Sequence, residues 1–299
     1  MHRPPANGNR RSEWRTVEQP PVEFPTVTVA FSTTGTAAAA GANAPGMTSA
    51  QNHGAGCRAP ATPQPPGVGG RYCAGMRALL IANSADADAG FVGDRFRHHG
   101  FAFSECHREF PGEWPPLDGI DLVLSLGSEW SVYWPHVAQS VAAEAALIGD
   151  AQRRGVPQFG ICFGNQTMAH ALGGTVERGR EPEIGWCDVV TDVPEVIAEG
   201  PWLQWHYDVI TVPPHAEELA RSTVGPQAWR LGRSLATQFH PEATETMLAR
   251  WTTGAGAEEL ARIGVLPAEL MAETRANVVD SRVRAEGLVD WFLDSVAGA

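Results

Sequence analysis

The chain has 299 residues, of which 34 are acidic and 22 basic, so its formal net charge is −12. All basic residues are arginine, which excludes a Walker A lysine, a Schiff-base lysine for pyridoxal phosphate and the Ser-Ser-Lys machinery of the large amidase class. The acidic balance argues against nucleic acid or an anionic membrane as the main partner, and no apolar stretch approaches the roughly eighteen residues of a membrane span.

Residues 1–75 are rich in Pro, Ala, Gly, Thr and Ser and, apart from a short run at 27–31, lack helical or strand periodicity. Such a segment buries too little apolar area to offset its chain entropy, so we predict that it is disordered. Met76 directly precedes the first expected strand, and a misplaced start codon explains the segment at least as well as a transit peptide does. Five cysteines without paired spacing indicate a reducing compartment, and we expect a cytoplasmic protein.

From Arg77 onward, patterns typical of strands and helices alternate. The expected strands cover residues 78–82, 101–105, 122–126, 157–161, 188–191, 207–212 and 235–239, and the expected helices cover 91–99, 134–154, 166–172 and 247–251. This alternation predicts an α/β fold with a mainly parallel sheet, helices on both faces and an active site at the carboxyl ends of the strands. We predict a domain over residues 76–254 and a C-terminal helical extension of two amphipathic helices over 255–299.

The sequence from Val156 to Leu172 has the pattern of a nucleophile elbow. An apolar run ends at Cys162, glycines stand two residues before and two after it, and a helical pattern starts at once. So sharp a strand-to-helix turn strains the residue at its apex, and Gly160 and Gly164 let the backbone pass where a Cβ would collide. The N-terminus of the following helix stabilises negative charge on the sulfur. Cys162 is therefore the candidate nucleophile.

A second motif supplies a base and an acid. His240 directly follows the expected strand 235–239, Pro241 stops further pairing, and Glu242 follows two residues after the imidazole. Nucleophilic catalysis by a thiol needs a base that takes its proton and later protonates the leaving amine, and a carboxylate that fixes the tautomer of that base. His240 and Glu242 are the candidates for these two roles.

In this order, the motifs resemble those of the class I (triad-type) glutamine amidotransferases. The matching residues are 160–166, 171–176, 183–186 and 238–242, and the resemblance covers about residues 77–250. The nearest relatives look like stand-alone members similar to the glutaminase domain of GMP synthase. The resemblance implies a flavodoxin-like three-layer sandwich, a glutamine-hydrolysing enzyme and no cofactor.

The resemblance also implies the role of each site residue. Cys162 would attack the side-chain amide of glutamine, His240 and Glu242 would complete the triad, and water would hydrolyse a glutamyl thioester after ammonia leaves. The oxyanion would be held by the backbone N–H of Phe163 and by one from the loop 126–133, which contains Gly127 and Ser128. The expected substrate contacts are Gln166, His206, Tyr207 and Asp208.

Three positions depart from the family pattern. Ser128 stands where a second glycine is usual, which restricts the peptide flip that forms the oxyanion hole, and Asn165 stands where histidine is frequent. Tyr207 stands where glycine is common, and its bulk reshapes the glutamine pocket. This last departure therefore bears on the identity of the substrate rather than on the triad.

Three functions stay open at this stage. The first is a glutaminase that supplies ammonia to a separate synthetase, because nothing in the chain resembles an ATP pyrophosphatase or ATP-grasp domain. The second is a hydrolase of another γ-glutamyl amide, and the third is a non-catalytic binding or regulatory module, which the intact triad disfavours. We expect no metal, since His98, His99 and His107 with Cys106 lack a further ligand at suitable spacing, and we expect Cys57, Cys73, Cys106 and Cys187 to be core residues.

Overall fold

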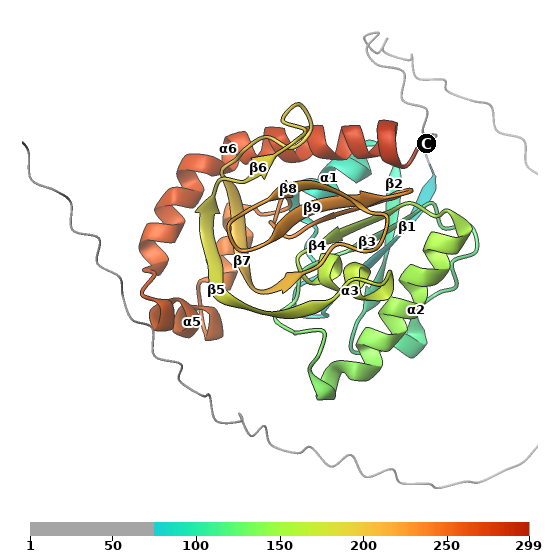
Figure 1. Cartoon of the computed structure of the whole chain (residues 1–299), viewed down its shortest axis with the longest axis horizontal. Coiled ribbons are helices and arrows are strands. Elements are labelled where there is room, and N and C mark those ends of the chain that lie inside the picture. Colours follow the sequence, from blue (N-terminus) through green and yellow to red (C-terminus); the bar gives the residue numbers. More distant parts are fainter. Residues whose placement is uncertain (1–74, 299) are drawn as a thin grey trace, which may run out of the picture. The chain divides into compact units, whose positions relative to one another are not determined.

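The computed structural model describes residues 75–298, in which an eight-stranded sheet and a two-stranded sheet combine with helices (Figure 1). The order of the large sheet is β2-β1-β3-β4-β10-β9-β8-β6. Three predictions concern residues 1–74 and lie outside the described residues: disorder, a short run at 27–31, and core roles for Cys57 and Cys73.

One half of the large sheet is parallel. It consists of β1 (Met76–Ala82), β2 (Phe101–His107), β3 (Leu122–Ser125), β4 (Gln158–Ile161) and β10 (Ser234–Thr237). Every neighbouring pair in the series β2-β1-β3-β4-β10 is parallel. This is the doubly wound order of flavodoxin-like folds, in which ligands bind beyond the carboxyl ends of the strands. The predicted α/β fold with a mainly parallel sheet is confirmed.

Helices cover both faces of this half because the side chains of a strand alternate between two apolar faces. Ala78 and Leu80 pack with α1 (Gly90–His98) and with the end of α6 (Pro267–Trp291), while Leu79 and Ile81 pack against α2 (Ala138–Arg154). The helix α3 (Phe163–Ala171) lies beside α2, as Figure 1 shows. The result is the three-layer arrangement expected from the sequence.

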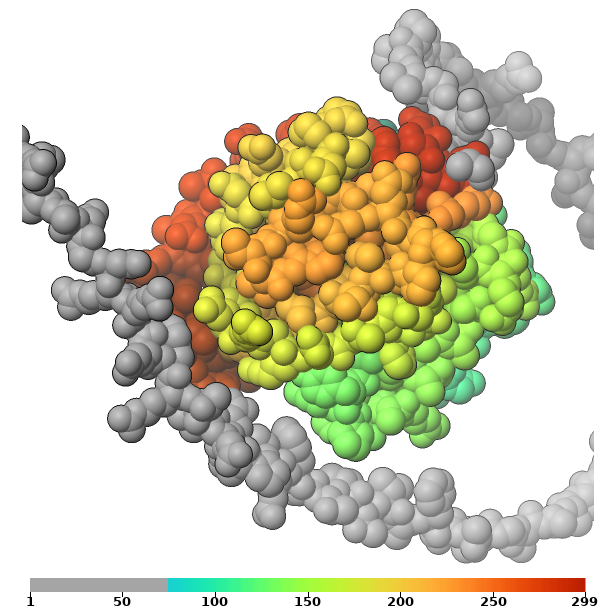
Figure 2. Space-filling model, in the orientation of Figure 1, coloured from blue at the N-terminus to red at the C-terminus, as the bar shows by residue number. Residues whose placement is uncertain are grey.

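The other half of the large sheet is antiparallel. Here β10 pairs with β9 (Pro226–Leu231), β9 with β8 (Glu217–Arg221), and β8 with the short edge strand β6 (Val190–Thr191). The orange segment that contains β8 and β9 fills the centre of the surface in Figure 2. The sequence pattern misses β8 and β9, because both are short and carry charged residues that interrupt an apolar alternation. The strand expected over residues 188–191 is reduced to β6.

The two-stranded sheet corrects another expectation. It pairs β5 (Val176–Cys187) with β7 (Trp202–Ile210) in antiparallel fashion. The strand expected over 207–212 therefore begins already at Trp202 and lies outside the main sheet. Glycines, Pro182 and many charged residues hide β5 in the sequence, and its register with β7 shifts between Arg178 and Glu183.

The chain after the last parallel strand is helical. The helix α4 (Glu245–Trp251) is capped by Thr244, whose hydroxyl accepts a hydrogen bond from Met247 N. Next come α5 (Ala255–Ile263), α6 and a π-helical turn at Phe292–Val296, in the segment where the sequence predicts two helices. Two 3₁₀ turns, η1 (Pro111–Glu113) and η2 (Pro135–Val137), complete the elements, and η2 replaces the start of the helix expected over 134–154.

We expect a truncated protein that begins at Met76 to keep the melting temperature and the activity of the full chain. β1 starts at this residue, pairs with both β2 and β3, and its last five residues are buried. Calorimetry and an activity assay of both forms test this expectation. A second truncation that also removes β1 should not fold, because it opens the middle of the parallel half. An insoluble or inactive Met76 form would show that earlier residues hold structure the compositional argument overlooks.

Candidate active site

Cys162 lies at the turn between β4 and α3. Its φ of +53° and ψ of −104° form a backbone conformation that residues other than glycine rarely adopt. The following residue, Phe163, already begins α3, three residues earlier than expected. The nucleophile elbow is therefore present at the carboxyl edge of the sheet, and Cys162 is 4% exposed.

The two glycines beside the elbow are required by close packing. A Cβ on Gly160 would lie 2.4 Å from Met168 Sδ, and a Cβ on Gly164 would lie 2.2 Å from the backbone oxygen of Ser125. Both distances are far shorter than a van der Waals contact, so a side chain would separate the elements. Without one, the first turn of α3 rests on the end of β3, and Gly164 N donates a hydrogen bond of 3.1 Å to Leu126 O.

His240 and Glu242 lie just beyond the end of β10. His240 Nδ1 is 2.7 Å from Glu242 Oε1, and the two residues are 4% and 1% exposed. His240 Nε2 has no hydrogen-bond partner among residues 75–298, and Cys162 is close enough to help raise the pKa of the imidazole. The structure thus brings together the three residues that the sequence motifs nominate as a triad.

The charge state of His240 follows from these neighbours. Burial disfavours the imidazolium, but the neighbouring side chains of Glu242 and Cys162 outweigh burial and raise the pKa of His240 well above its ordinary value of 6.5. An imidazolium in this position can give a proton to a leaving group held at the sulfur.

The loop 126–133 lies beside this pair. A Cβ on Gly127 would lie 3.1 Å from His240 Cε1 and 3.6 Å from Cys162 Cβ, so the backbone here approaches both residues closely. Phe163 is the first residue of α3, and its N–H therefore has no acceptor within the helix. Ser128 Oγ accepts a hydrogen bond from Trp130 N at 3.1 Å, which engages this side chain within its own loop.

Gln166 and Asn165 stand on the first turn of α3, and both are buried. Gln166 Nε2 is 3.4 Å from Gln238 Oε1, which also accepts a 3.0 Å hydrogen bond from Asn165 Nδ2. Asn165 Oδ1 accepts from Trp229 Nε1 at 2.6 Å. Asn165, which stands where histidine is frequent in the family, thus connects α3 to β9 and to the end of β10.

His206 and Asp208 lie on the buried side of β7. Both ring nitrogens of His206 are engaged by the protein, Nδ1 at 3.0 Å from Asp208 O and Nε2 at 3.1 Å from Glu183 Oε2. Asp208 Oδ1 accepts a 2.8 Å hydrogen bond from the hydroxyl of Tyr133. Because Tyr133 belongs to the loop 126–133, this bond links that loop with β7.

Tyr207 has its contacts with β5 and α5. The Arg178 guanidinium lies 4.4 Å from the centre of its ring, and burial, helped by the charge and hydrogen bond of Glu259, raises the pKa of Tyr207 to about 12. Trp205 Nε1 also donates to Glu259, at 2.9 Å, while Trp205 O lies 3.8 Å from Cys162 Sγ. Tyr207 therefore lies on the other face of β7 from the buried residues His206 and Asp208.

Two supports of the site were not apparent from the sequence. The start of α1 holds the backbone of Glu242, since Phe91 N donates to Glu242 O at 3.1 Å and a Cβ on Gly90 would lie 1.9 Å from that oxygen. A buried ion pair, Arg108 with Glu144, reaches the loop 126–133. Three features of the sequence could have pointed to these supports: Gly90 at the start of a helix, Arg108 directly after a strand, and Glu144 within an apolar helical pattern.

Two of the histidines considered as metal ligands are paired with carboxylates instead. His99 Nε2 pairs with Asp290 at 2.7 Å, and His107 Nε2 pairs with Glu105 at 3.1 Å. In residues 75–298, no three His, Cys, Asp or Glu side chains lie close enough together to hold a metal ion. None of the helices in this part of the chain is both long enough and apolar enough to cross a membrane.

Comparison with known proteins gives a family match, similar sequences and a similar solved structure. Residues 135–250 match the family model described as "Glutamine amidotransferase class-I". The GMP synthase [glutamine-hydrolyzing] of Aeropyrum pernix is 35% identical over 201 residues, which are 62% of this chain and 36% of that protein. The GMP synthase [glutamine-hydrolyzing] of Mycobacterium marinum is 34% identical over 225 residues, which are 70% of this chain and 40% of that protein. A solved glutamine amidotransferase from Thermotoga maritima is 27% identical with a TM-score of 0.66, covering 74% of this chain and 99% of that chain.

Residues 135–250 thus match the class I glutamine amidotransferases, a family characterised by a cysteine nucleophile, and the fold of the described residues is similar to that of a solved member. Within this class, the chain is similar to the glutaminase domain of GMP synthase. It spans less than half the length of those curated relatives, at 36% and 40%.

Proposed function

We propose that this protein hydrolyses the side-chain amide of glutamine and releases ammonia, with Cys162, His240 and Glu242 as its catalytic triad. The observation that supports this proposal is the buried His240–Glu242 pair, at 2.7 Å, beside a cysteine held in a strained elbow. A cysteine that serves only to fill a core needs neither the strained backbone nor the adjacent base and acid.

In the proposed mechanism, the Cys162 thiolate attacks the amide carbon, and the amide oxygen becomes an oxyanion bound by the N–H of Phe163 and an N–H from Gly127 or Ser128. The His240 imidazolium then gives its proton to the amide nitrogen, the C–N bond breaks, and ammonia leaves. His240 next takes a proton from water, whose oxygen attacks the thioester carbon. Glutamate and the free thiolate result, and Glu242 keeps Nδ1 of the imidazole protonated throughout.

We further propose that the ammonia passes to a separate synthetase. The similar proteins are named GMP synthases, and this chain corresponds to 36% of the Aeropyrum pernix enzyme. Its match to the amidotransferase class supports the glutaminase half-reaction, and an acceptor-activating enzyme is then needed as a partner. The substrate, glutamine, is a small molecule, and the chemistry requires no metal or organic cofactor.

One observation favours a second candidate, a hydrolase of another γ-glutamyl amide. Tyr207 replaces the glycine that is common in the family, its ring packs against the Arg178 guanidinium, and Glu259 lies near enough to help raise the pKa of its hydroxyl. A residue that is held in one orientation can select a substrate by stacking or by hydrogen bonding.

Glutamate release from glutamine and from a panel of γ-glutamyl amides separates the two candidates. For a glutaminase, we expect glutamine to be the best substrate, and Tyr207→Phe and Tyr207→Gly to keep its turnover within about threefold, because loss of a ring contact without a substrate partner costs little. For the second candidate, Tyr207→Gly should lower kcat/KM for the preferred amide by roughly tenfold to 100-fold, with Tyr207→Phe reporting the hydroxyl alone. Absence of turnover on every compound, with and without candidate synthetases, would contradict both.

A further inference from the structure

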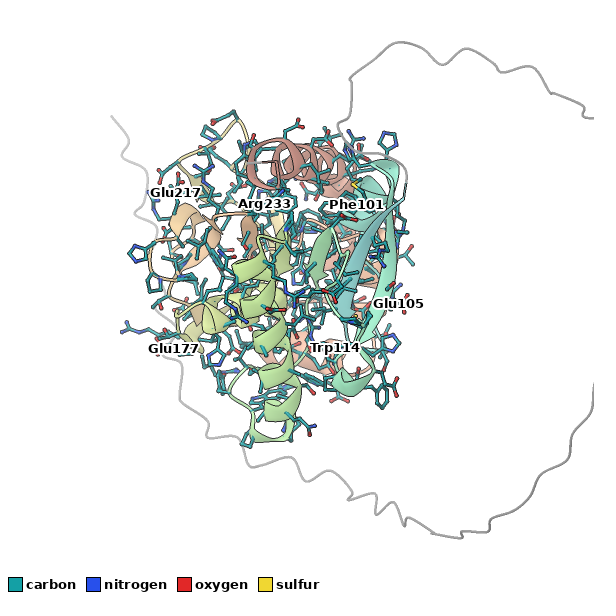
Figure 3. The ribbon with its side chains drawn as sticks, turned by 90° about the vertical axis from the view of Figure 1, so that its right-hand side faces the viewer. Phe101, Glu105, Trp114, Glu177, Glu217 and Arg233 are labelled. Atoms are coloured by element: carbon teal, nitrogen blue, oxygen red, sulfur yellow. The ribbon has the colours of Figure 1, made fainter. Side chains whose placement is uncertain are left out.

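Arg108 is a fully buried arginine directly after the carboxyl end of β2. Figure 3 shows β2 running from Phe101, near the end of α6, toward Glu105. Arg108 Nε and Nη2 donate to the carboxylate of Glu144 on α2, at 2.8 and 3.3 Å, and Glu144 is itself fully buried. A buried ion pair is seldom more stabilising than apolar residues of the same volume, so stability alone does not account for this one.

The same guanidinium holds the start of the loop 126–133. Its Nη2 donates to Leu126 O at 2.7 Å, and its Nη1 donates to Gly127 O at 3.0 Å. Leu126 O also accepts the hydrogen bond from Gly164 N, in the first turn of α3. One side chain thus fastens two successive carbonyl groups of the loop, and the first of them is shared with the elbow helix.

Arg108 also reaches the elbow itself. Its guanidinium carbon lies 4.8 Å from the centre of the Phe163 ring, a cation–π distance. Phe163 and the Gly127–Ser128 peptide are the two proposed sources of N–H donors for the oxyanion. Arg108 therefore contacts both segments that supply these donors.

We propose that Arg108, held by Glu144, is a positioning residue that presets the Gly127–Ser128 peptide for oxyanion binding; this inference rests on the proposed glutaminase function. In a planar trans peptide, the C=O and N–H groups point in opposite directions. Fixing Gly127 O on Arg108 therefore turns the N–H of Ser128 away from the arginine. Because Ser128 lacks the conformational freedom of glycine, a peptide oriented in advance replaces a flip on substrate binding.

The test replaces the pair as a unit, in Arg108→Met/Glu144→Gln, because removal of one partner would leave a buried charge unpaired. We expect kcat to fall by about 10- to 100-fold while KM changes less than about threefold, since donors aimed at the oxyanion act mainly in the transition state. Affinity for glutamate γ-semialdehyde, whose aldehyde forms a tetrahedral adduct with the thiol, should fall by the same factor as kcat/KM. Alkylation of Cys162 by iodoacetamide needs no oxyanion and should keep its rate.

Two further variants separate positioning from folding. The matched control is Arg95→Met/Asp290→Asn, which removes an ion pair of 2.5 Å between α1 and α6 and should lower the melting temperature without changing kcat. Arg108→Lys keeps the positive charge beside Glu144, but its single ammonium cannot replace the forked contacts to both carbonyl groups, so we expect kcat to fall here as well. Arg108→Lys remains informative if the double variant does not fold.

Hydrogen exchange of the backbone N–H groups of residues 126–131 measures how firmly Arg108 holds this loop, and it needs no substrate. Faster exchange of this loop in Arg108→Met/Glu144→Gln, with α3 unchanged, supports the proposal. Folded variants at position 108 with wild-type kcat, aldehyde affinity and loop exchange would overturn it. A wild-type protein that neither hydrolyses glutamine nor binds the aldehyde contradicts the proposed function instead, and the exchange measurement still decides whether Arg108 holds the loop.

Discussion

Replacing Cys162 by alanine is expected to lower glutamine turnover by at least about 10⁴-fold while leaving the fold intact, because covalent catalysis has no route without its nucleophile. The alanine side chain keeps the Cβ and the strained backbone, so elbow and helix remain in place. Steady-state ammonia release and the thermal unfolding midpoint measure the two parts of this expectation. Activity close to that of the wild type would remove Cys162 from the mechanism.

Chemical labelling gives an independent check of the same residue. A chloroketone that mimics glutamine should modify Cys162 alone. Burial raises the pKa of both Cys106 and Cys187 to about 11, so these thiols stay protonated and unreactive at neutral pH. Cys106→Ala is the matched control and should keep both activity and labelling. Peptide mapping that places the label on a cysteine other than Cys162 would contradict the assignment.

The parallel half of the fold could be predicted from the sequence because four of its five strands are apolar runs followed by a helical pattern, at residues 78–82, 122–126, 157–161 and 235–239. Local signals of this kind also predicted Cys162, since the glycines on either side encode the turn directly. The β8–β9 hairpin and β5 could not be predicted in this way. Their stability comes from pairing with distant strands, and charged residues, Pro182 and glycines obscure their periodicity.

The same distinction applies to the site. His240 and Glu242 are two residues apart, so their pairing is visible in a motif. Arg108 and Glu144 are 36 residues apart and lie on different elements, so only the fold shows that they reach the loop 126–133. The alternation along β7, which separates Tyr207 from His206 and Asp208, likewise depends on a strand boundary that the sequence pattern places too late.

His240→Ala is expected to reduce kcat by about 10⁴-fold, nearly as much as loss of Cys162, whereas Glu242→Gln should leave more activity, about 10²- to 10³-fold below wild type. The imidazole transfers a proton in both half-reactions, while the carboxylate acts only through the imidazole. Single-turnover measurements of ammonia and glutamate release distinguish the two steps. Equal activity of His240→Ala and wild type would exclude the triad mechanism.

The raised pKa of His240 predicts how stability and activity depend on pH. Glu242 and Cys162 outweigh burial and raise the pKa of His240, so protonated His240 stabilises the fold. This contribution to the free energy of unfolding is fully present below an unfolded pKa of about 6.5, and it is lost as the pH rises through the higher folded pKa. Glu242→Gln removes one of the raising charges, so the pKa of His240 should fall. We therefore expect the alkaline limb of kcat/KM, where the imidazolium loses its proton, to move to lower pH in this variant, together with the alkaline loss of unfolding free energy. An alkaline limb that stays in place would mean that Glu242 does not control the protonation of His240, and that its effect on rate arises from orientation alone.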